Sequence, residues 1–196
     1  MKKSLFLGLI IACLASCTEK ENPFLIQKNQ VGKLHKDITV KQLDSVFAND
    51  SLVKRIGEGD YVQAGTDKYL IYEKGGKQLF TLTPRQQHDE NEKIKTIQIH
   101  DPRFKTEKGV SLNSTFKDIR ENYKIKYIHN TLNNLVITAV GDEYFMIDKK
   151  ELPEDLRYDM KLNIDAIQIP DAAKIKQFMI NWEHEETPKT EEKDAQ

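Results

Sequence analysis

The chain contains few residues whose types and spacing could carry out chemistry. Its five histidines do not occur in spacings such as H-x-H or H-E-x-x-H, which present several ligands to one metal ion. His184-Glu185-Glu186 lies in a charged terminal run, and Asp89-Glu90-Asn91-Glu92 lacks the glycine and the spacing of a calcium-binding loop. Neither a G-x-S-x-G nucleophile elbow nor a phosphate-binding loop occurs. We therefore expect no catalytic residue, no metal and no cofactor, and we predict that the protein is not an enzyme.

Cysteine chemistry is confined to the N-terminal region, which holds both cysteines, Cys13 and Cys17. Met1-Lys2-Lys3-Ser4 is a short basic start, and a nearly apolar run from Leu5 to Leu14 follows it. As a helix this run would be roughly 15 Å long, about half of the hydrocarbon thickness of a bilayer. It is therefore too short to span a membrane, but it has the length of the apolar region of a secretory signal peptide. A buried apolar helix with an incidental cysteine is the alternative.

The segment Leu14-Ala15-Ser16-Cys17 resembles the lipobox of bacterial lipoproteins, whose cysteine receives a diacylglyceryl group and then an N-terminal acyl chain. The resemblance implies that residues 1–16 are a lipoprotein signal peptide and that Cys17 is the lipid-attachment residue. Cys13 would leave with the signal peptide, so the mature chain would keep no thiol for a disulfide or for nucleophilic catalysis.

Charge and composition divide the rest of the chain. Lys and Arg number 30 and Asp and Glu number 31, a net charge of −1, so no basic field favours nucleic acid as a partner. Residues 183–196 are acidic and lack large apolar side chains, which predicts a disordered tail. Residues 17–30 are mostly polar and predict a flexible tether. The remaining residues, 31–182, have the length of a single domain.

An internal repeat is expected to organise this domain. Ile94-Lys95-Thr96-Ile97-Gln98-Ile99-His100-Asp101 is similar to Ile164-Asp165-Ala166-Ile167-Gln168-Ile169-Pro170-Asp171, and alternating isoleucines predict half-buried strands. Upstream, Thr39 and Thr115 can each cap a helix. The apolar helical stripes that follow are Val40, Leu43 and Phe47, and Phe116, Ile119 and Tyr123.

Each half also contains a predicted hairpin between its helix and its isoleucine strand. The first joins residues 69–73 to 78–83 through Gly75-Gly76, and the second joins 135–140 to 144–149. A last strand is favoured at 175–182 because its apolar residues alternate; a helix beginning at Asp171 is the alternative.

The expected fold class is α+β, with two repeats of helix–hairpin–strand forming an antiparallel sheet with helices on one face. The two units span about 31–100 and 108–182. Two unrelated halves of an α+β domain are the alternative.

The two units are also similar to the unit of the SmpA/OmlA small outer-membrane lipoproteins. The matching residues are Gly32, Thr39, Leu43 and Phe47, and Gly109, Thr115, Ile119 and Tyr123. The tandem arrangement resembles that of the β-lactamase inhibitory protein. The chain departs from the family after each helix, where Ala48-Asn49-Asp50 and Lys124-Ile125 stand in place of frequent glycines. Since members of both families bind other proteins, the resemblance implies a binding function.

The segment His100-Asp101-Pro102-Arg103-Phe104 joins the two units and offers an arginine beside an aromatic residue. Both residue types are enriched in protein interfaces, so Arg103 and Phe104 are the candidate interface residues. The alternative is a linker whose Phe104 packs into the junction.

Together these features predict a lipid-anchored lipoprotein of the bacterial cell envelope that acts as a non-catalytic protein-binding or accessory module. Its expected partners are the membrane, through the lipid on Cys17, and an envelope protein. We expect it in the outer membrane, with the periplasmic or surface face left open. The alternative is an envelope receptor for a small ligand, with the binding site between the two units.

Overall fold

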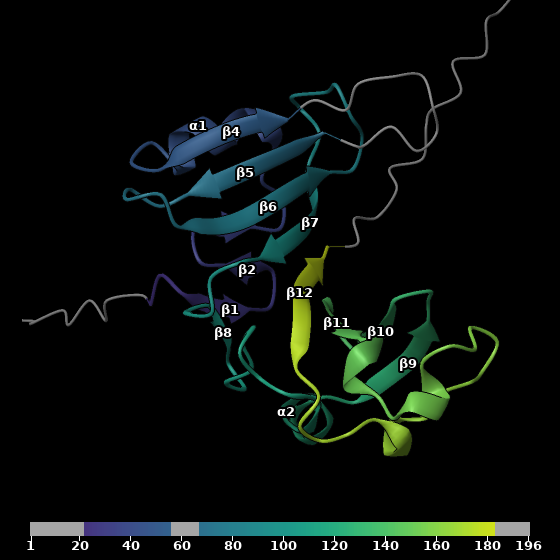
Figure 1. The fold of residues 1–196 in the computed structure, drawn as a ribbon. Coiled ribbons are helices and arrows are strands. Elements are labelled where there is room, and N and C mark those ends of the chain that lie inside the picture. Colours follow the sequence, from purple (N-terminus) through teal and green to yellow (C-terminus); the bar gives the residue numbers. More distant parts are fainter. Residues whose placement is uncertain (1–21, 56–66, 183–196) are drawn as a thin grey trace, which may run out of the picture.

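The structure is a computed structural model that describes residues 22–55 and 67–182. Within these ranges it has 12 strands but only two α-helices, of 4 and 7 residues. The fold is therefore mostly β, and the predicted α+β class with helices on one sheet face is wrong (Figure 1). The predicted signal peptide, Cys17 and the acidic tail lie outside the described residues.

Eight strands form one antiparallel sheet in the order β4-β5-β6-β7-β12-β11-β10-β9. The first half consists of β4 (Ser51–Arg55), β5 (Lys68–Tyr72), β6 (Gln78–Pro84) and β7 (Ile94–Ile99). The second half consists of β9 (Ile125–Asn130), β10 (Asn134–Ala139), β11 (Glu143–Asp148) and β12 (Ile175–Asn181). The predicted hairpins are confirmed as β5–β6 and β10–β11, and the predicted last strand is confirmed as β12. The halves meet where β7 pairs with β12, with Gln98 opposite Met179.

A second, four-stranded sheet has the order β3-β2-β1-β8. Its strands are β1 (Leu25–Gln27), β2 (Gln30–Val31), β3 (Leu34–His35) and β8 (Lys105–Thr106). Ile26 is buried in the same core as the large sheet, and β1 pairs in parallel with β8. Residues 22–30 therefore belong to the folded domain, which corrects the predicted tether of residues 17–30.

The helical segments are short. α1 (Leu43–Val46) continues the 3-10 turn η1 (Val40–Gln42), and α2 (Phe116–Asn122) has two turns. Three further 3-10 turns, η2 (Lys149–Glu151), η3 (Glu154–Leu156) and η4 (Ala166–Gln168), lie in the connection before β12. The predicted threonine caps are confirmed, because the Thr39 N–H donates to Gln42 Oε1 (2.9 Å) and the Thr115 N–H to Asp118 Oδ2 (2.7 Å). No helix in the described ranges has the length and apolar character needed to cross a bilayer.

Backbone hydrogen bonds at corresponding positions show that the two halves are built alike. In each half, the first two helical N–H groups donate to the segment just before the last strand. These bonds are Val40 N to Glu92 O and Lys41 N to Glu90 O in the first half, and Phe116 N to Ala173 O and Lys117 N to Asp171 O in the second. The repeated unit is thus a short helix followed by four consecutive antiparallel strands.

Strand register extends the equivalence to single residues. Phe80 of β6 pairs with Ile99 of β7, and Glu143 of β11 pairs with Ile180 of β12 at the same place in the second half. Phe80 and Glu143 therefore occupy equivalent positions. Phe47 and Tyr123 are also equivalent, because each caps the C-terminus of its helix through a backbone N–H.

The isoleucine repeat is not the structural repeat. The predicted strand at 164–169 is wrong, since this segment contains η4 and the Ile167 side chain is 88% exposed. Asp165 opens η4, with its N–H donating to Gln168 Oε1 (2.9 Å), and Pro170 has no N–H for a ladder bond. The equivalent of β7 is β12.

The hydrophobic core lies on one face of the large sheet. The small sheet, the two helices and the connection between β11 and β12 all contribute side chains to it. Its largest fully buried side chains are Trp182, Phe80, Phe104, Phe116, Phe145 and Phe178. A mostly irregular layer, with little helix in it, covers this face of the sheet.

Candidate protein-binding face

The other face of the eight-stranded sheet is left uncovered by the described elements. Figure 1 shows α1 behind β4 and the small sheet behind and below β6 and β7, with no described helix or strand in front of β4–β7. Strand register places one side chain from each of the eight strands in a single row across this face. In sheet order this cross-sheet row is Val53, Leu70, Thr81, Gln98, Met179, Tyr144, Thr138 and Tyr127. Val53 and Tyr127 at its ends are exposed, whereas Leu70 is only 7% exposed.

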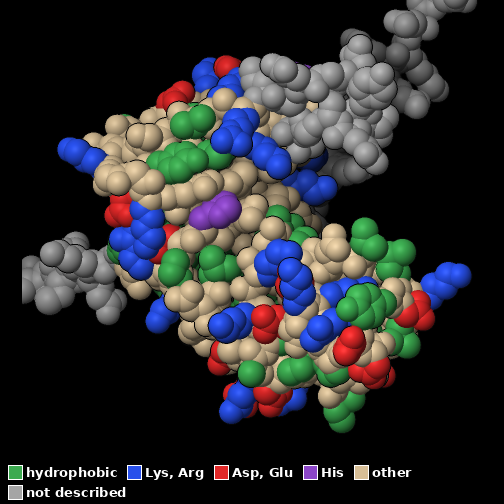
Figure 2. Space-filling view, viewed as in Figure 1, with side chains coloured by type: hydrophobic (Ala, Val, Ile, Leu, Met, Phe, Trp, Pro, Cys, Tyr) green, Lys and Arg blue, Asp and Glu red, His purple; other side chains and the backbone are tan. Residues whose placement is uncertain are grey.

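No member of the cross-sheet row is charged. The row on one side begins with the charged Arg55 and Lys68 and continues through Thr83, Thr96 and Asn181. The row on the other side includes Gln177, Met146, Val136 and His129. Depletion of Lys, Glu and Asp, with Tyr and Met present, is typical of the central part of protein interfaces. Figure 2 shows apolar, uncharged and histidine side chains over the middle of β4–β7, with Lys and Arg side chains beside them.

Two titratable groups on this face are uncharged at neutral pH, and burial favours the neutral form of each. The half-buried Tyr144 phenol has its pKa raised because burial disfavours the phenolate. His100 follows β7, and its Nε2 lies 2.8 Å from Thr81 Oγ1. Burial lowers the pKa of His100, so its imidazole is uncharged at neutral pH. The centre of the face is therefore electrostatically neutral.

A hollow of about 640 Å³ lies over the second half of this face. Its walls include Tyr127, Thr138 and Tyr144, with the exposed Lys95 and Lys126 among its charged members. The hollow has the size of a pocket for a drug-sized ligand or a few side chains. An exposed sheet face of this composition can receive a segment of another protein.

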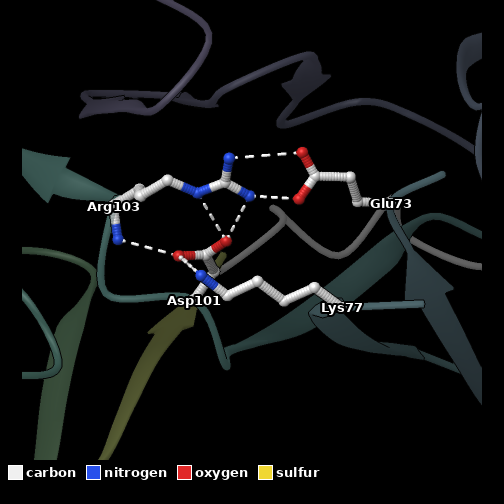
Figure 3. Close-up of polar contacts among 4 residues, drawn as sticks. All are labelled: Glu73, Lys77, Asp101 and Arg103. Atoms are coloured by element: carbon white, nitrogen blue, oxygen red, sulfur yellow. Dashed lines mark hydrogen bonds and ion pairs between the residues drawn. The ribbon is translucent and has the colours of Figure 1, made fainter. Parts of the chain in front are cut away.

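The predicted interface residue Arg103 belongs instead to a polar network at the junction of the units (Figure 3). Its backbone N–H and guanidinium donate to Asp101, and its guanidinium also donates to Glu73. Lys77 adds a bond of 3.0 Å to Asp101, whose side chain is fully buried. Burial pushes the pKa of Asp101 upward, but the bonds from Arg103 and Lys77 outweigh it and hold the pKa below its usual value. Arg103 thus locks the segment after β7 to the β5–β6 turn.

Phe104 is only 2% exposed and packs between Phe24 and Phe80, with ring centroids 5.1 and 4.5 Å away. Phe104 therefore offers no surface to a partner. It packs into the junction, as the alternative to the interface hypothesis predicted. Gly32 is required here, because its φ is +54° and a Cβ would lie 2.7 Å from the Pro23 carbonyl oxygen. Replacing Phe104 would therefore disturb folding before it disturbed recognition.

The residues considered for chemistry do not converge. Among the described residues, no group of three or more His, Cys, Asp or Glu side chains could hold a metal ion. His184 lies outside the described residues. The alternative function, an envelope receptor, placed a small-ligand site between the two units. At the boundary between the two halves, the β7–β12 ladder forms a continuous sheet.

The sequence analysis did not predict the uncovered face, because it considered only the apolar, buried side of each predicted strand. The signal was present in the intervening positions of each strand. Those positions hold Thr81, Gln98, Met179 and Tyr144, where a simply solvated face would carry mostly charged residues. The edge strands β4 and β9, each just after its helix, were also missed, and without them the row is incomplete.

No family model and no curated protein matches the chain. Among solved structures, it is similar to the crystal structure of the uncharacterized protein YfeY from Escherichia coli, with a TM-score of 0.51 and 13% sequence identity. The match covers 82% of this chain and 99% of that chain. At this identity, the similarity shows a shared fold alone.

Proposed function

We propose that the protein is a lipid-anchored outer-membrane lipoprotein that binds another envelope protein through the uncovered face of its eight-stranded sheet, without catalysis. The observation that carries the proposal is the uncharged cross-sheet row, which runs through all eight strands. Keeping this row free of charged side chains favours its burial against a partner, because charged groups are costly to desolvate.

The anchor supports weak, local recognition. If Cys17 is acylated, residues 17–21 separate the lipid from the first described residue, a reach of at most about 18 Å. A domain held this close to the membrane meets partners in the same membrane at an effective concentration in the mM range. A modest affinity is then sufficient for stable association.

Site-specific photo-crosslinking tests the binding face directly. A photoreactive amino acid is placed at Gln98, Thr138 or Met179 on the uncovered face, and at Lys117 or Ile167 as controls away from it. We expect the three face positions to crosslink in cells to the same discrete protein, and the controls to give no such product. Crosslinks from Lys117 and Ile167 alone would contradict the proposal.

The anchor has its own test. Cys17→Ser should abolish acylation and leave an unprocessed or soluble protein, whereas Cys13→Ala should have no effect because that residue is discarded. The measurement is metabolic labelling with a fatty acid, followed by membrane fractionation. A Cys17→Ser protein that stays with membranes after an alkaline wash would refute lipid anchoring through this residue.

A further inference from the structure

A second hollow lies next to the hollow on the uncovered face. This cavity of about 270 Å³ is lined by β1, β8, the end of α2, the β10–β11 turn and the end of β12. Its walls include Thr106, Tyr123, Glu143 and Trp182. The β10–β11 turn, Val140–Glu143, lines both this cavity and the hollow over the sheet, so the two are neighbours.

Glu143 stands at an unusual place in this cavity. The equivalent position in the first half is Phe80, which is buried in the core. The equivalent of Phe47 is Tyr123, and the Tyr123 hydroxyl donates to Glu143 Oε1 at 3.2 Å. A carboxylate at a core-facing position costs free energy that a phenyl ring would not. The first half has two phenylalanines at these positions, so the hydrogen-bonded pair is a feature of the second half alone.

A lysine of the protein itself already lies over the aromatic ring in this cavity. Lys108 Nζ lies 4.2 Å from the centroid of the Tyr123 ring, in the position of a cation–π contact. Lys108 is exposed and comes from the turn after β8, so its side chain can move aside. Besides Glu143, the acidic residues Glu107 and Asp142 line the cavity, and Lys28 lines it together with Lys108, so three acidic residues stand against two lysines. An aromatic face with carboxylates around it fits an ammonium or guanidinium group on an apolar stem.

We propose that this cavity receives a lysine or arginine side chain of the protein that docks on the uncovered face, with the incoming cation replacing Lys108 over Tyr123 and pairing with Glu143. This inference rests on the proposed function, and it names the chemistry of the partner's anchor residue. The apolar stem of the incoming side chain would lie against Ile180 and Trp182, which line the same cavity.

Trp182 makes the proposal measurable, because it is the only tryptophan of the chain. The full-length protein is titrated with Nα-acetyl-lysine methylamide or Nα-acetyl-arginine methylamide while the indole N–H signal of Trp182 is followed by NMR. The norleucine analogue, which keeps the stem and lacks the charge, is the matched control. We expect saturable shifts with the two basic probes in the millimolar range and none with norleucine. No saturable response, or an equal response to norleucine, would overturn the proposal.

Two variants that should change the affinity for the basic probes in opposite directions sharpen the test. Glu143→Gln should weaken the basic probes about tenfold, since the charge-assisted bond is lost. Lys108→Ala should tighten them, because the internal competitor is removed. Glu154→Gln, an exposed carboxylate in η3, should change nothing. If Lys108→Ala weakens binding, the cavity does not work in this way. If these probes fail while substitutions on the cross-sheet row still abolish partner capture, the inference falls and the proposed function stands.

Discussion

The two halves of the large sheet share a backbone plan but fill one pair of equivalent positions in opposite ways. In the first half, the Phe47 and Phe80 rings lie 6.3 Å apart beside a cavity of about 160 Å³ whose lining also includes Lys33, Asp50 and Glu73. Lys33 Nζ lies 5.8 Å from the centroid of the Phe47 ring. In the second half, the corresponding Tyr123 and Glu143 are hydrogen bonded and line a larger cavity with further carboxylates. Burial raises the pKa of Tyr123, so its hydroxyl remains a donor to Glu143. The first pair is apolar and buried, whereas the second pair carries the polar groups on which the proposed recognition rests.

The largest expected difference between the halves is in the stability lost when the equivalent residues Phe80 and Glu143 are truncated. Phe80→Ala should cost about 3–5 kcal/mol of unfolding free energy, because a fully buried ring leaves a cavity. Glu143→Ala should change stability by less than about 1 kcal/mol, since it removes a partly exposed carboxylate with a single hydrogen bond. Urea unfolding of the two variants gives both values. Similar losses would show that the two positions have the same role.

A second pair of substitutions tests which segment is the counterpart of β7. Ile97→Ala should cost about 2–5 kcal/mol because Ile97 is fully buried in the core. Ile167→Ala should lie within about 0.5 kcal/mol of the unmodified protein, because its side chain is almost entirely in solvent. The same urea titration applies. A large loss at Ile167 would restore the isoleucine repeat as the structural one.

Asp101 marks another difference between the halves, since its equivalent after β12 is Trp182. Asp101→Asn should cost about 1–3 kcal/mol, less than a fully buried ion pair, because Arg103 and Lys77 are partly exposed. The folded-state pKa of Asp101 is lowered, so its ionised form stabilises the fold above about pH 4. This contribution is lost as the pH falls through the folded-state pKa.

The pH dependence provides the measurement for this third prediction. The unfolding free energy of the unmodified protein should fall more steeply on acidification below about pH 4 than that of Asp101→Asn. Thermal unfolding between neutral pH and pH 3 compares the two. Parallel curves would mean that another carboxylate, and not Asp101, carries the acid sensitivity.

Local rules in the sequence predicted local structure well. The sequence identifies Thr39 and Thr115 as helix caps and places the two hairpins and the last strand near their observed bounds. These features depend on neighbours along the chain, so composition and spacing are sufficient to find them.

Features that depend on distant contacts could not be read in this way. Residues 164–169 have the isoleucine spacing of a strand, but Asp165 and Pro170 favour a capped turn, and β12 takes the central place in the sheet. The burial of Phe104 depends on Phe24 and Phe80, which lie far away in the sequence. The cross-sheet row is likewise a property of register between strands, which no single segment encodes.

The central claim, that the uncovered face binds a protein, is tested most directly by inserting charge into the cross-sheet row. Tyr127 and Thr138 are paired across β9 and β10, and the Tyr127 side chain is 53% exposed, so Tyr127→Glu with Thr138→Glu should be compatible with folding. Ile167→Glu, away from the face, is the matched control. Affinity capture of the lipoprotein from crosslinked cells should lose the partner in the double variant and keep it in the control. Thermal unfolding should show both variants folded, with a modest loss of stability in the double variant because its two carboxylates lie directly opposite each other. Undiminished capture by the folded double variant would contradict the claim.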